Sequence, residues 1–98
     1  MTRYKYDVVH SNKFKKDLKL LIKQGKDINK LLDIVDALAN KEILESRYKV
    51  HKLFDNKYYK NCFECHIEPD WLLIYQYNEE KLILLLMNSG THSELFDK

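Results

Sequence analysis

The chain has 98 residues and a formal net charge of +2; 45% of its residues are hydrophobic, 33% are charged, two are glycine and one is proline. This composition is typical of one small globular domain and excludes collagen-like, disordered and low-complexity chains. No apolar run approaches the roughly 18 residues of a membrane span, and the polar start MTRYKYDVVHSNKFKK does not resemble a secretory signal. We therefore expect residues 1–98 to form a single domain of a soluble, cytoplasmic protein with two reduced cysteines.

Charge is distributed unevenly along the chain. Residues 1–60 contain 15 Lys or Arg against 8 Asp or Glu, whereas residues 61–98 contain 2 against 7. Such asymmetry favours a basic surface for an anionic partner. The alternative is that the lysines form only the solvated sides of amphipathic helices, and charge alone leaves both interpretations open.

The first half of the chain predicts a strand and two helices. Tyr4–His10 is β-branched and aromatic, which is typical of a strand. Ser11 can cap a helix that stops at Gly25, and a second helix starts near Asp27 and ends near Asn40. The connection between them is short, so the two helices should form an αα-hairpin. The apolar positions with helical spacing are Phe14, Leu18, Leu21, Ile22, Ile28, Leu31, Leu32, Val35 and Leu38.

The second half predicts an irregular connection and then three strands. Lys41–Lys60 has no helical period, and a connection of this length in a compact domain is often functional. Pro69 separates the first two strands, and the turn at residues 78–80 separates the last two. The predicted strands are Asn61–Ile67, Trp71–Tyr77 and Lys81–Met87.

The elements together predict an α+β fold. Thr91 and Glu94 match a T-x-x-E capping box, so a short helical turn should follow the last strand. The order is then β-α-α-β-β-β, with a two-helix hairpin on one face of a mainly antiparallel sheet.

Residues 62–66, CFECH, match the C-x-x-C-H pattern of haem attachment and of half a zinc site. On a strand, however, Cys62 and His66 face one side of the sheet and Cys65 faces the other. At about 3.3 Å per residue the two cysteines lie about 10 Å apart, too far for a disulfide. A structural zinc site needs four ligands, and no second pair is present. We interpret the cysteines as core packing and expect no metal or cofactor.

Three of the four histidines stand where they could converge. His51 is in the long connection, His66 is on the first of the three later strands, and His92 follows the last strand. His10 is interpreted as a surface residue. A single histidine is more often structural than catalytic, so only the three histidines taken together indicate a functional site.

Two longer motifs closely resemble the YafQ branch of the RelE/ParE superfamily of type II toxins. They are HIEPDWLLIY at residues 66–75 and GTHSELF at residues 90–96. The chain length, the order of elements and HKL at residues 51–53 also agree, so the resemblance spans essentially the whole chain.

This resemblance implies a RelE-like fold and a toxin that cleaves messenger RNA in the ribosomal A site. The chemistry of the family is metal-free attack of a ribose 2′-OH on the adjacent phosphate, which leaves a 2′,3′-cyclic phosphate and a 5′-OH. A cognate antitoxin of the DinJ or RelB type would hold the toxin inactive. The basic residues of the first 60 positions would bind ribosomal RNA phosphates.

Carried over by position, the resemblance implies four catalytic residues. His92 is expected to be the general acid, His66 and Asp70 form the base side, and His51 orients the phosphate. Imidazole suits the first two roles because it titrates near neutral pH. The implied substrate-binding residues are the stacking surfaces Trp71 and Phe96 and the cations Lys52 and Lys60.

Two positions depart from the family pattern. Where the family commonly has arginines, this chain has Phe63 and Asn88. The loss of a preorganised cation beside the reacting phosphate can lower the rate about 10²-fold or more. Lys60 could replace the charge, but as a point charge rather than a planar fork. The alternative function is therefore a catalytically weak or degenerate toxin that acts as a binding module for its antitoxin or another target.

Overall fold

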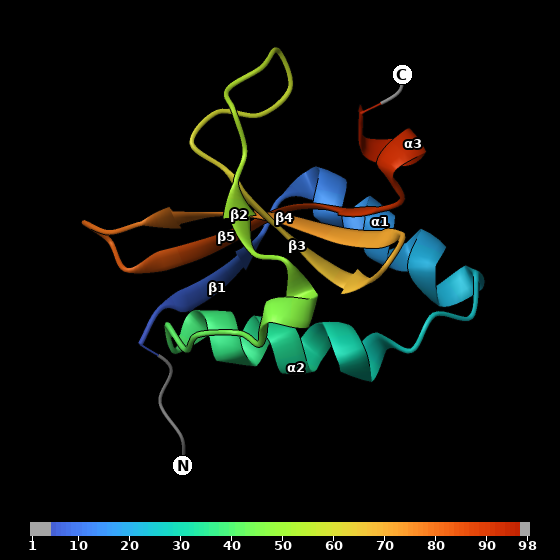
Figure 1. Cartoon of the computed structure of the whole chain (residues 1–98), viewed down its shortest axis with the longest axis horizontal. Helices are drawn as coiled ribbons and strands as arrows, with labels where there is room; N and C mark the ends of the chain where they lie inside the picture. The colour runs from blue at the N-terminus through green and yellow to red at the C-terminus, as the bar shows by residue number, and fades with distance from the viewer. Residues whose placement is uncertain (1–4, 97–98) are drawn as a thin grey trace.

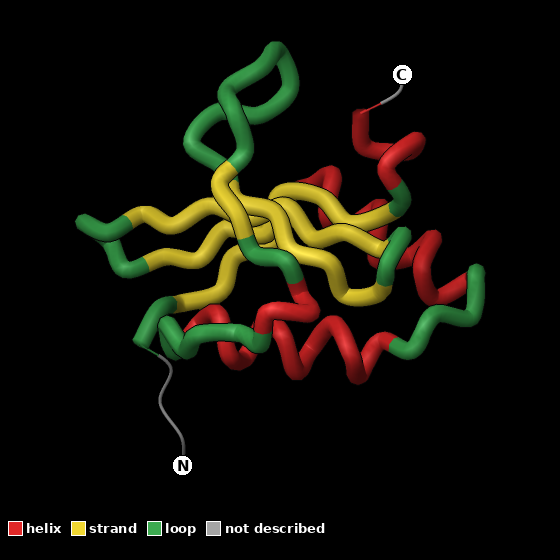
Figure 2. The backbone as a smooth tube through the Cα atoms, viewed as in Figure 1, coloured by secondary structure: helices red, strands yellow, loops and turns green. Residues whose placement is uncertain are grey.

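The computed structural model describes residues 5–96, which fold into one five-stranded sheet with helices around it (Figures 1 and 2). The strand order is β1-β5-β4-β3-β2; β1 pairs in parallel with β5 and the other neighbours are antiparallel. The predicted α+β fold and mainly antiparallel sheet are confirmed. The elements are β1 (Asp7–His10), α1 (Asn12–Lys23), α2 (Ile28–Ala39), the 3₁₀ helix η1 (Ser46–Tyr48), β2 (His51–Lys52), β3 (Phe63–Glu68), β4 (Trp71–Asn78), β5 (Ile83–Gly90) and α3 (His92–Phe96).

The caps of the two long helices are those that the sequence predicts. Ser11 Oγ accepts a hydrogen bond from Phe14 N at 3.0 Å and donates one to Met87 O at 2.7 Å, so the start of α1 is fixed to β5. Asp27 caps α2 in the same way, and Gly25 between the helices has φ +75°, which favours glycine. The predicted start of β1 at Tyr4 lies outside the described residues.

The main core lies between the sheet and the α1–α2 hairpin, on what we call the helix face. Two of the predicted core positions are exposed instead: Ile22 is 58% exposed and Leu32 is 51% exposed, because both lie at the edge of the apolar stripe of their helix. Ile34 and Ala39 are buried in addition. The buried residues of this core are Tyr6, Phe14, Leu21, Leu31, Ile34, Val35, Leu38, Ala39, Cys65, Ile67, Trp71, Leu73, Tyr75, Leu84 and Leu86.

A smaller apolar cluster lies on the opposite face of the sheet, which we call the α3 face. It is built around buried side chains from the loop before β3, from β4 and from α3. In Figure 1, α3 and the loop between β2 and β3 lie above the sheet, and α2 lies below it. The cluster comprises Tyr59, Cys62, Leu72, Ile74 and Leu95.

The strands differ from the prediction at their ends and in their number. Lys5 and Tyr6 are bends, so β1 starts at Asp7, and β3 starts at Phe63 rather than at Asn61, which has φ +54°. The connection expected to be irregular contains β2, whose two residues pair with β3 through His51↔Glu64 and Lys52↔Phe63. The last turn covers residues 79–82 rather than 78–80, and β5 therefore starts at Ile83 and continues to Gly90. Among residues 5–96, no helix is long and apolar enough to cross a membrane.

Candidate active site

Strand β3 places its polar residues on the α3 face. Side chains alternate along a strand, so Glu64 and His66 share one face, and the His51↔Glu64 register brings His51 to the same side. The Nε2 atoms of His51 and His66 both lie 3.4 Å from Oε1 of Glu64. The Glu64 side chain is only 4% exposed. A buried carboxylate is costly unless it is paired, and two imidazoles pair it here.

The second nitrogen of each of these rings also faces an acceptor. Nδ1 of His51 lies 3.0 Å from Lys49 O, and Nδ1 of His66 lies 3.3 Å from Pro69 O. A neutral imidazole has one N–H, whereas the doubly protonated ring can donate to both acceptors. The surroundings of His51 and His66 are therefore arranged to accept hydrogen bonds from an imidazolium.

The third histidine reaches the site from the end of β5. Leu72 pairs with Gly90, so the corner before β4 lies beside the start of α3. Asp70 Oδ1 then lies 3.8 Å from His92 Nδ1 and accepts from His92 N at 3.4 Å. The expected grouping of Asp70 with His66 is thus replaced by a contact between Asp70 and His92. Both side chains are more than half exposed.

A capping box fixes His92 at the first position of α3. Thr91 N donates to Glu94 Oε1 at 2.8 Å, and Glu94 N donates to Thr91 Oγ1 at 3.2 Å, which confirms the predicted box. A Cβ at Gly90 would lie 2.7 Å from Glu94 Oε1, so a larger residue there would displace the carboxylate that accepts from Thr91 N. The G-T-H-S-E sequence therefore sets the direction in which His92 leaves the sheet.

The two groups of polar residues meet between His66 and His92. Their ring centroids are 5.9 Å apart, and His92 lies 5.8 Å from the ring of Phe96, one turn further along α3. Phe96 in turn packs edge-on against Tyr59 at 5.5 Å. The structure therefore brings together five of the residues expected from the sequence: His51, His66, Asp70, His92 and Phe96.

Trp71 is not part of this surface, and its expected role as a stacking surface is wrong. Its side chain is 1% exposed in the helix-face core, and its Nε1 donates to Ser89 Oγ at 2.9 Å. Lys52 pairs with Phe63, which packs on the helix face, so Lys52 leaves β2 on the side away from the histidines. Lys60 is exposed on the loop before β3, and its role in binding stays a prediction.

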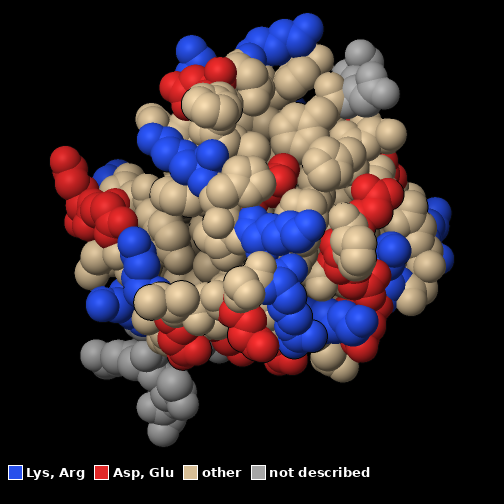
Figure 3. All heavy atoms as spheres, viewed as in Figure 1, with Lys and Arg blue, Asp and Glu red and all other residues tan. Residues whose placement is uncertain are grey.

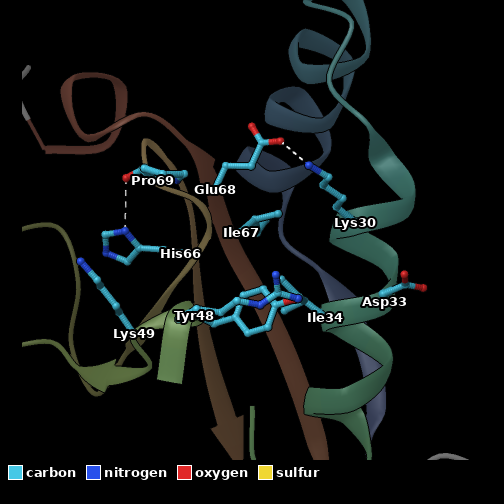
Figure 4. A pocket seen from close by; sticks show the side chains of 10 residues that line it. Lys30, Asp33, Ile34, Tyr48, Lys49, His66, Ile67, Glu68 and Pro69 are labelled. Carbon is cyan, nitrogen blue, oxygen red and sulfur yellow. Dashed lines mark hydrogen bonds and ion pairs between the residues drawn. The ribbon is translucent and has the colours of Figure 1, made fainter. Parts of the chain in front are cut away.

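A cavity of about 630 Å³ lies beside His66, between the end of β3, η1 and α2 (Figure 4). Its cations come from different elements: Lys30 on α2, Arg47 on η1 and Lys49 just after η1. Lys30 forms an ion pair with Glu68 at 2.8 Å, which lowers the pKa of that carboxyl. In Figure 4 the Lys49 side chain runs beside His66, so this lysine is the cation that the cavity offers to the site.

The cysteines of the C-x-x-C-H pattern face opposite sides of the sheet, as predicted. Cys62 belongs to the cluster on the α3 face and Cys65 to the core on the helix face, and both are buried and free. Burial raises the pKa of the Cys65 thiol to about 12. Within residues 5–96, no three His, Cys, Asp or Glu side chains are grouped so that they could hold a metal ion.

Comparison with known proteins identifies the family. Residues 6–97 match the family described as a bacterial toxin of type II toxin-antitoxin system, YafQ. The chain belongs to the YafQ toxin family. The mRNA interferase toxin YafQ of Escherichia coli strain B / BL21-DE3 is 38% identical over 91 residues, which are 92% of this chain and 95% of that protein.

Solved structures of bacterial toxins have the same fold. A metal-bound toxin from Helicobacter pylori superposes with a TM-score of 0.87 at 42% identity, over 93% of this chain and 99% of that one. The toxin in an Escherichia coli DinJ-YafQ toxin-antitoxin complex gives a TM-score of 0.82 at 36% identity, over 94% and 98% of the two chains.

Glu64 is the site residue that the sequence interpretation of this YafQ-family chain missed. It stands two residues before His66, so alternation along a strand puts both side chains on one face. What the sequence could not supply was its pairing with His51, because β2 was not predicted.

The two positions that depart from the family pattern have structural roles in this YafQ-family chain. Phe63 stacks on Tyr75 with ring centroids 5.8 Å apart. Asn88 donates to Asp17 at 2.7 Å and accepts from the Tyr59 hydroxyl at 3.1 Å. Neither side chain can supply a positive charge to a phosphate, so any such charge has to come from the histidines or from neighbouring lysines.

Proposed function

We propose that this YafQ-family toxin is an endoribonuclease that cleaves messenger RNA in the ribosomal A site and so inhibits translation. The support is its family membership, the name of its Escherichia coli relative and the convergence of three histidines on one face of the sheet. The observation on which the proposal rests most is the opposed pair His66 and His92, 5.9 Å between ring centroids, each beside a carboxylate.

The reaction needs a base for the 2′-OH and an acid for the leaving 5′-oxygen. His66 takes the 2′ proton, the 2′-oxygen attacks phosphorus, the bond to the 5′-oxygen breaks, and His92 donates a proton to that oxygen. The products are a 2′,3′-cyclic phosphate and a 5′-OH, and no metal takes part in any of these steps. The ring nitrogen of His66 that takes the proton has to face the 2′-oxygen, and the other ring nitrogen keeps its contact with Glu64 or with Pro69 O, which holds the ring in place.

The remaining residues position the RNA. His51 shares Glu64 with His66 and faces the same side, where it can orient the scissile phosphate. Phe96 offers a partly exposed ring beside His92 on which an unstacked base can lie. Lysine and arginine side chains visible across the middle of Figure 3 can bind ribosomal RNA phosphates.

The toxin would act in the cytoplasm and be held inactive by an antitoxin of the DinJ or RelB type. This part of the proposal is supported by the Escherichia coli relative that was solved in complex with DinJ. Binding to this antitoxin would also report on folding, because a variant that binds it has kept the toxin fold.

The test is to express the chain with and without its antitoxin and to map the 5′ ends of a translated message. We expect ribosome-dependent cuts that leave 2′,3′-cyclic phosphates and that disappear in His92→Ala. The matched control is His10→Ala, because His10 is an exposed histidine at the end of β1, remote in the sheet from the site. Growth arrest with intact message in the wild type would reject cleavage.

A second candidate function is supported by Phe63 and Asn88. Because both are held by structural contacts and neither is a cation, the chain could be a slow enzyme, or a binding module for its antitoxin or another target. A wild-type chain that binds the antitoxin but leaves every message intact would establish the binding module.

A further inference from the structure

The loop that joins β2 to β3 exposes aromatic side chains. Residues 53–61 project from the sheet beside α3, on the side opposite α2 (Figure 1). Phe54 at the start of this loop is 94% exposed and Tyr58 near its end is 40% exposed. Single exposed apolar side chains are common on protein surfaces, so the case for a binding site depends on the groups that surround these two rings.

The loop is held in one shape by its own hydrogen bonds. Asn56 Oδ1 accepts from Tyr58 N at 2.8 Å and from Tyr59 N at 3.0 Å, and Asn56 N donates to Tyr59 O at 3.0 Å. Asp55 Oδ1 accepts from Asn61 N at 3.1 Å, which closes the loop. The exposed rings are therefore presented by an ordered turn, and little conformational entropy remains to be lost on binding.

The charges around the two rings are mainly positive. Lys57 Nζ lies 5.1 Å from the centroid of the Tyr58 ring, Lys60 lies near the end of the loop, and Lys52 directly precedes the loop. The one acidic residue of the loop, Asp55, uses its carboxylate to accept the backbone N–H of Asn61. At the top of Figure 3, where this loop lies, basic and acidic side chains stand together.

The loop is continuous with the active site. Its Tyr59 is buried against Phe96, the ring that lies beside His92. At its base, the loop connects β2 to β3, where His51 is paired with Glu64. A strand of RNA placed between His66 and His92 therefore has this loop as its neighbour.

We propose that the loop at residues 53–61 binds the single-stranded RNA that flanks the cleaved bond. Phe54 and Tyr58 stack on unpaired bases, and Lys57 and Lys60 bind the neighbouring phosphates. Exposed aromatic rings interleaved with cations are the combination by which proteins hold single strands without reading their sequence. The proposal rests on the proposed function in one respect, namely that RNA is the substrate.

The test measures binding without cleavage. A labelled single-stranded RNA of about 12 nucleotides, with a 2′-O-methyl group on every ribose, cannot be cut by 2′-OH attack and spans the binding length of an aromatic platform. We expect Phe54→Ala and Tyr58→Ala to raise its Kd about tenfold or more each, measured by fluorescence anisotropy with the full chain freed from its antitoxin. The matched control is Ile43→Ala, an apolar residue 99% exposed in another connection, which should leave the Kd unchanged.

Two further measurements make the result decisive. The wild type should prefer the single strand over a duplex of the same sequence, and Lys57→Ala should flatten the dependence of Kd on salt. The proposal is overturned if the wild type does not bind the RNA, or if the aromatic variants bind it within twofold of the wild type. It is equally overturned if these variants lose the antitoxin instead, since the loop is then a protein-docking surface. None of these outcomes affects the mapping of cuts with His92→Ala, so the two proposals fail separately.

Discussion

The two faces of β3 differ in what they contact, although their residues alternate along six positions of one strand. Cys65 and Ile67 on the helix face are 0% and 7% exposed and pack in the main core. Glu64 and His66 on the α3 face lie among polar groups, and the imidazole stays accessible at 16% side-chain exposure. Strand β3 thus links the main core to the candidate active site.

This difference separates stability from activity. The α3 face has only a small apolar cluster, and its polar residues are held by hydrogen bonds rather than by packing. Substitutions on the helix face should therefore destabilise the fold. Substitutions on the α3 face should slow message cleavage without unfolding the chain. The predictions below test whether the separation is this sharp.

The largest effect is expected on the helix face. Leu73 on β4 is 0% exposed and belongs to the core under the helices. Leu73→Ala removes buried methyl groups and leaves a cavity, so the free energy of unfolding should fall by about 2–5 kcal/mol. Urea denaturation measures this change. The control is Ile22→Ala, because Ile22 is an apolar helix residue that is 58% exposed, and its loss should cost less than about 0.5 kcal/mol. A similar fall for both variants would contradict the assignment of the core.

The α3 face should respond in the opposite way. Glu64→Gln keeps the size of the side chain but removes the charge that both His51 and His66 contact. We expect the rate of message cleavage to fall about tenfold or more, because a neutral amide accepts weaker hydrogen bonds from the two rings than a carboxylate does and holds their orientation less firmly. The midpoint of urea denaturation should change little, and Glu80→Gln in the exposed turn before β5 is the matched control for loss of a carboxylate. Full activity of Glu64→Gln would show that the carboxylate does not position the histidines.

The sequence predicted the helix face well because local rules determine it. Helical spacing, the caps at Ser11 and Asp27, and alternation along β3 all follow from residues close together in the chain, and the structure confirms them. Alternation also predicted that Cys62 and Cys65 face opposite sides of the sheet, and they lie in the two different apolar clusters.

The α3 face was predicted less completely because it depends on contacts between distant residues. The strand β2 has two exposed residues and no pattern of its own, so neither its pairing with β3 nor the contact of His51 with Glu64 could be foreseen. Asp70 meets His92 only because β4 and β5 pair in one register. Trp71 was misplaced because a motif does not show which face of the strand its aromatic residue occupies. The catalytic roles of the histidines stay predictions.

The smallest effect is expected on the α3 face, at the start of α3. Thr91 Oγ1 accepts from Glu94 N, and this bond starts a helix of five residues that holds both His92 and Phe96. Thr91→Ala should cost about 1 kcal/mol of local helix stability, since it removes an N-cap. Because α3 adds only Leu95 to the buried clusters, the global unfolding midpoint should barely move, while cleavage falls a few-fold. Hydrogen exchange of the α3 amides measures the fraying, and Ser93→Ala at the exposed neighbouring position is the control. If Thr91→Ala frays α3 and cleavage continues at the wild-type rate, His92 does not need a fixed helix to donate its proton, and the acid would act from a mobile chain end.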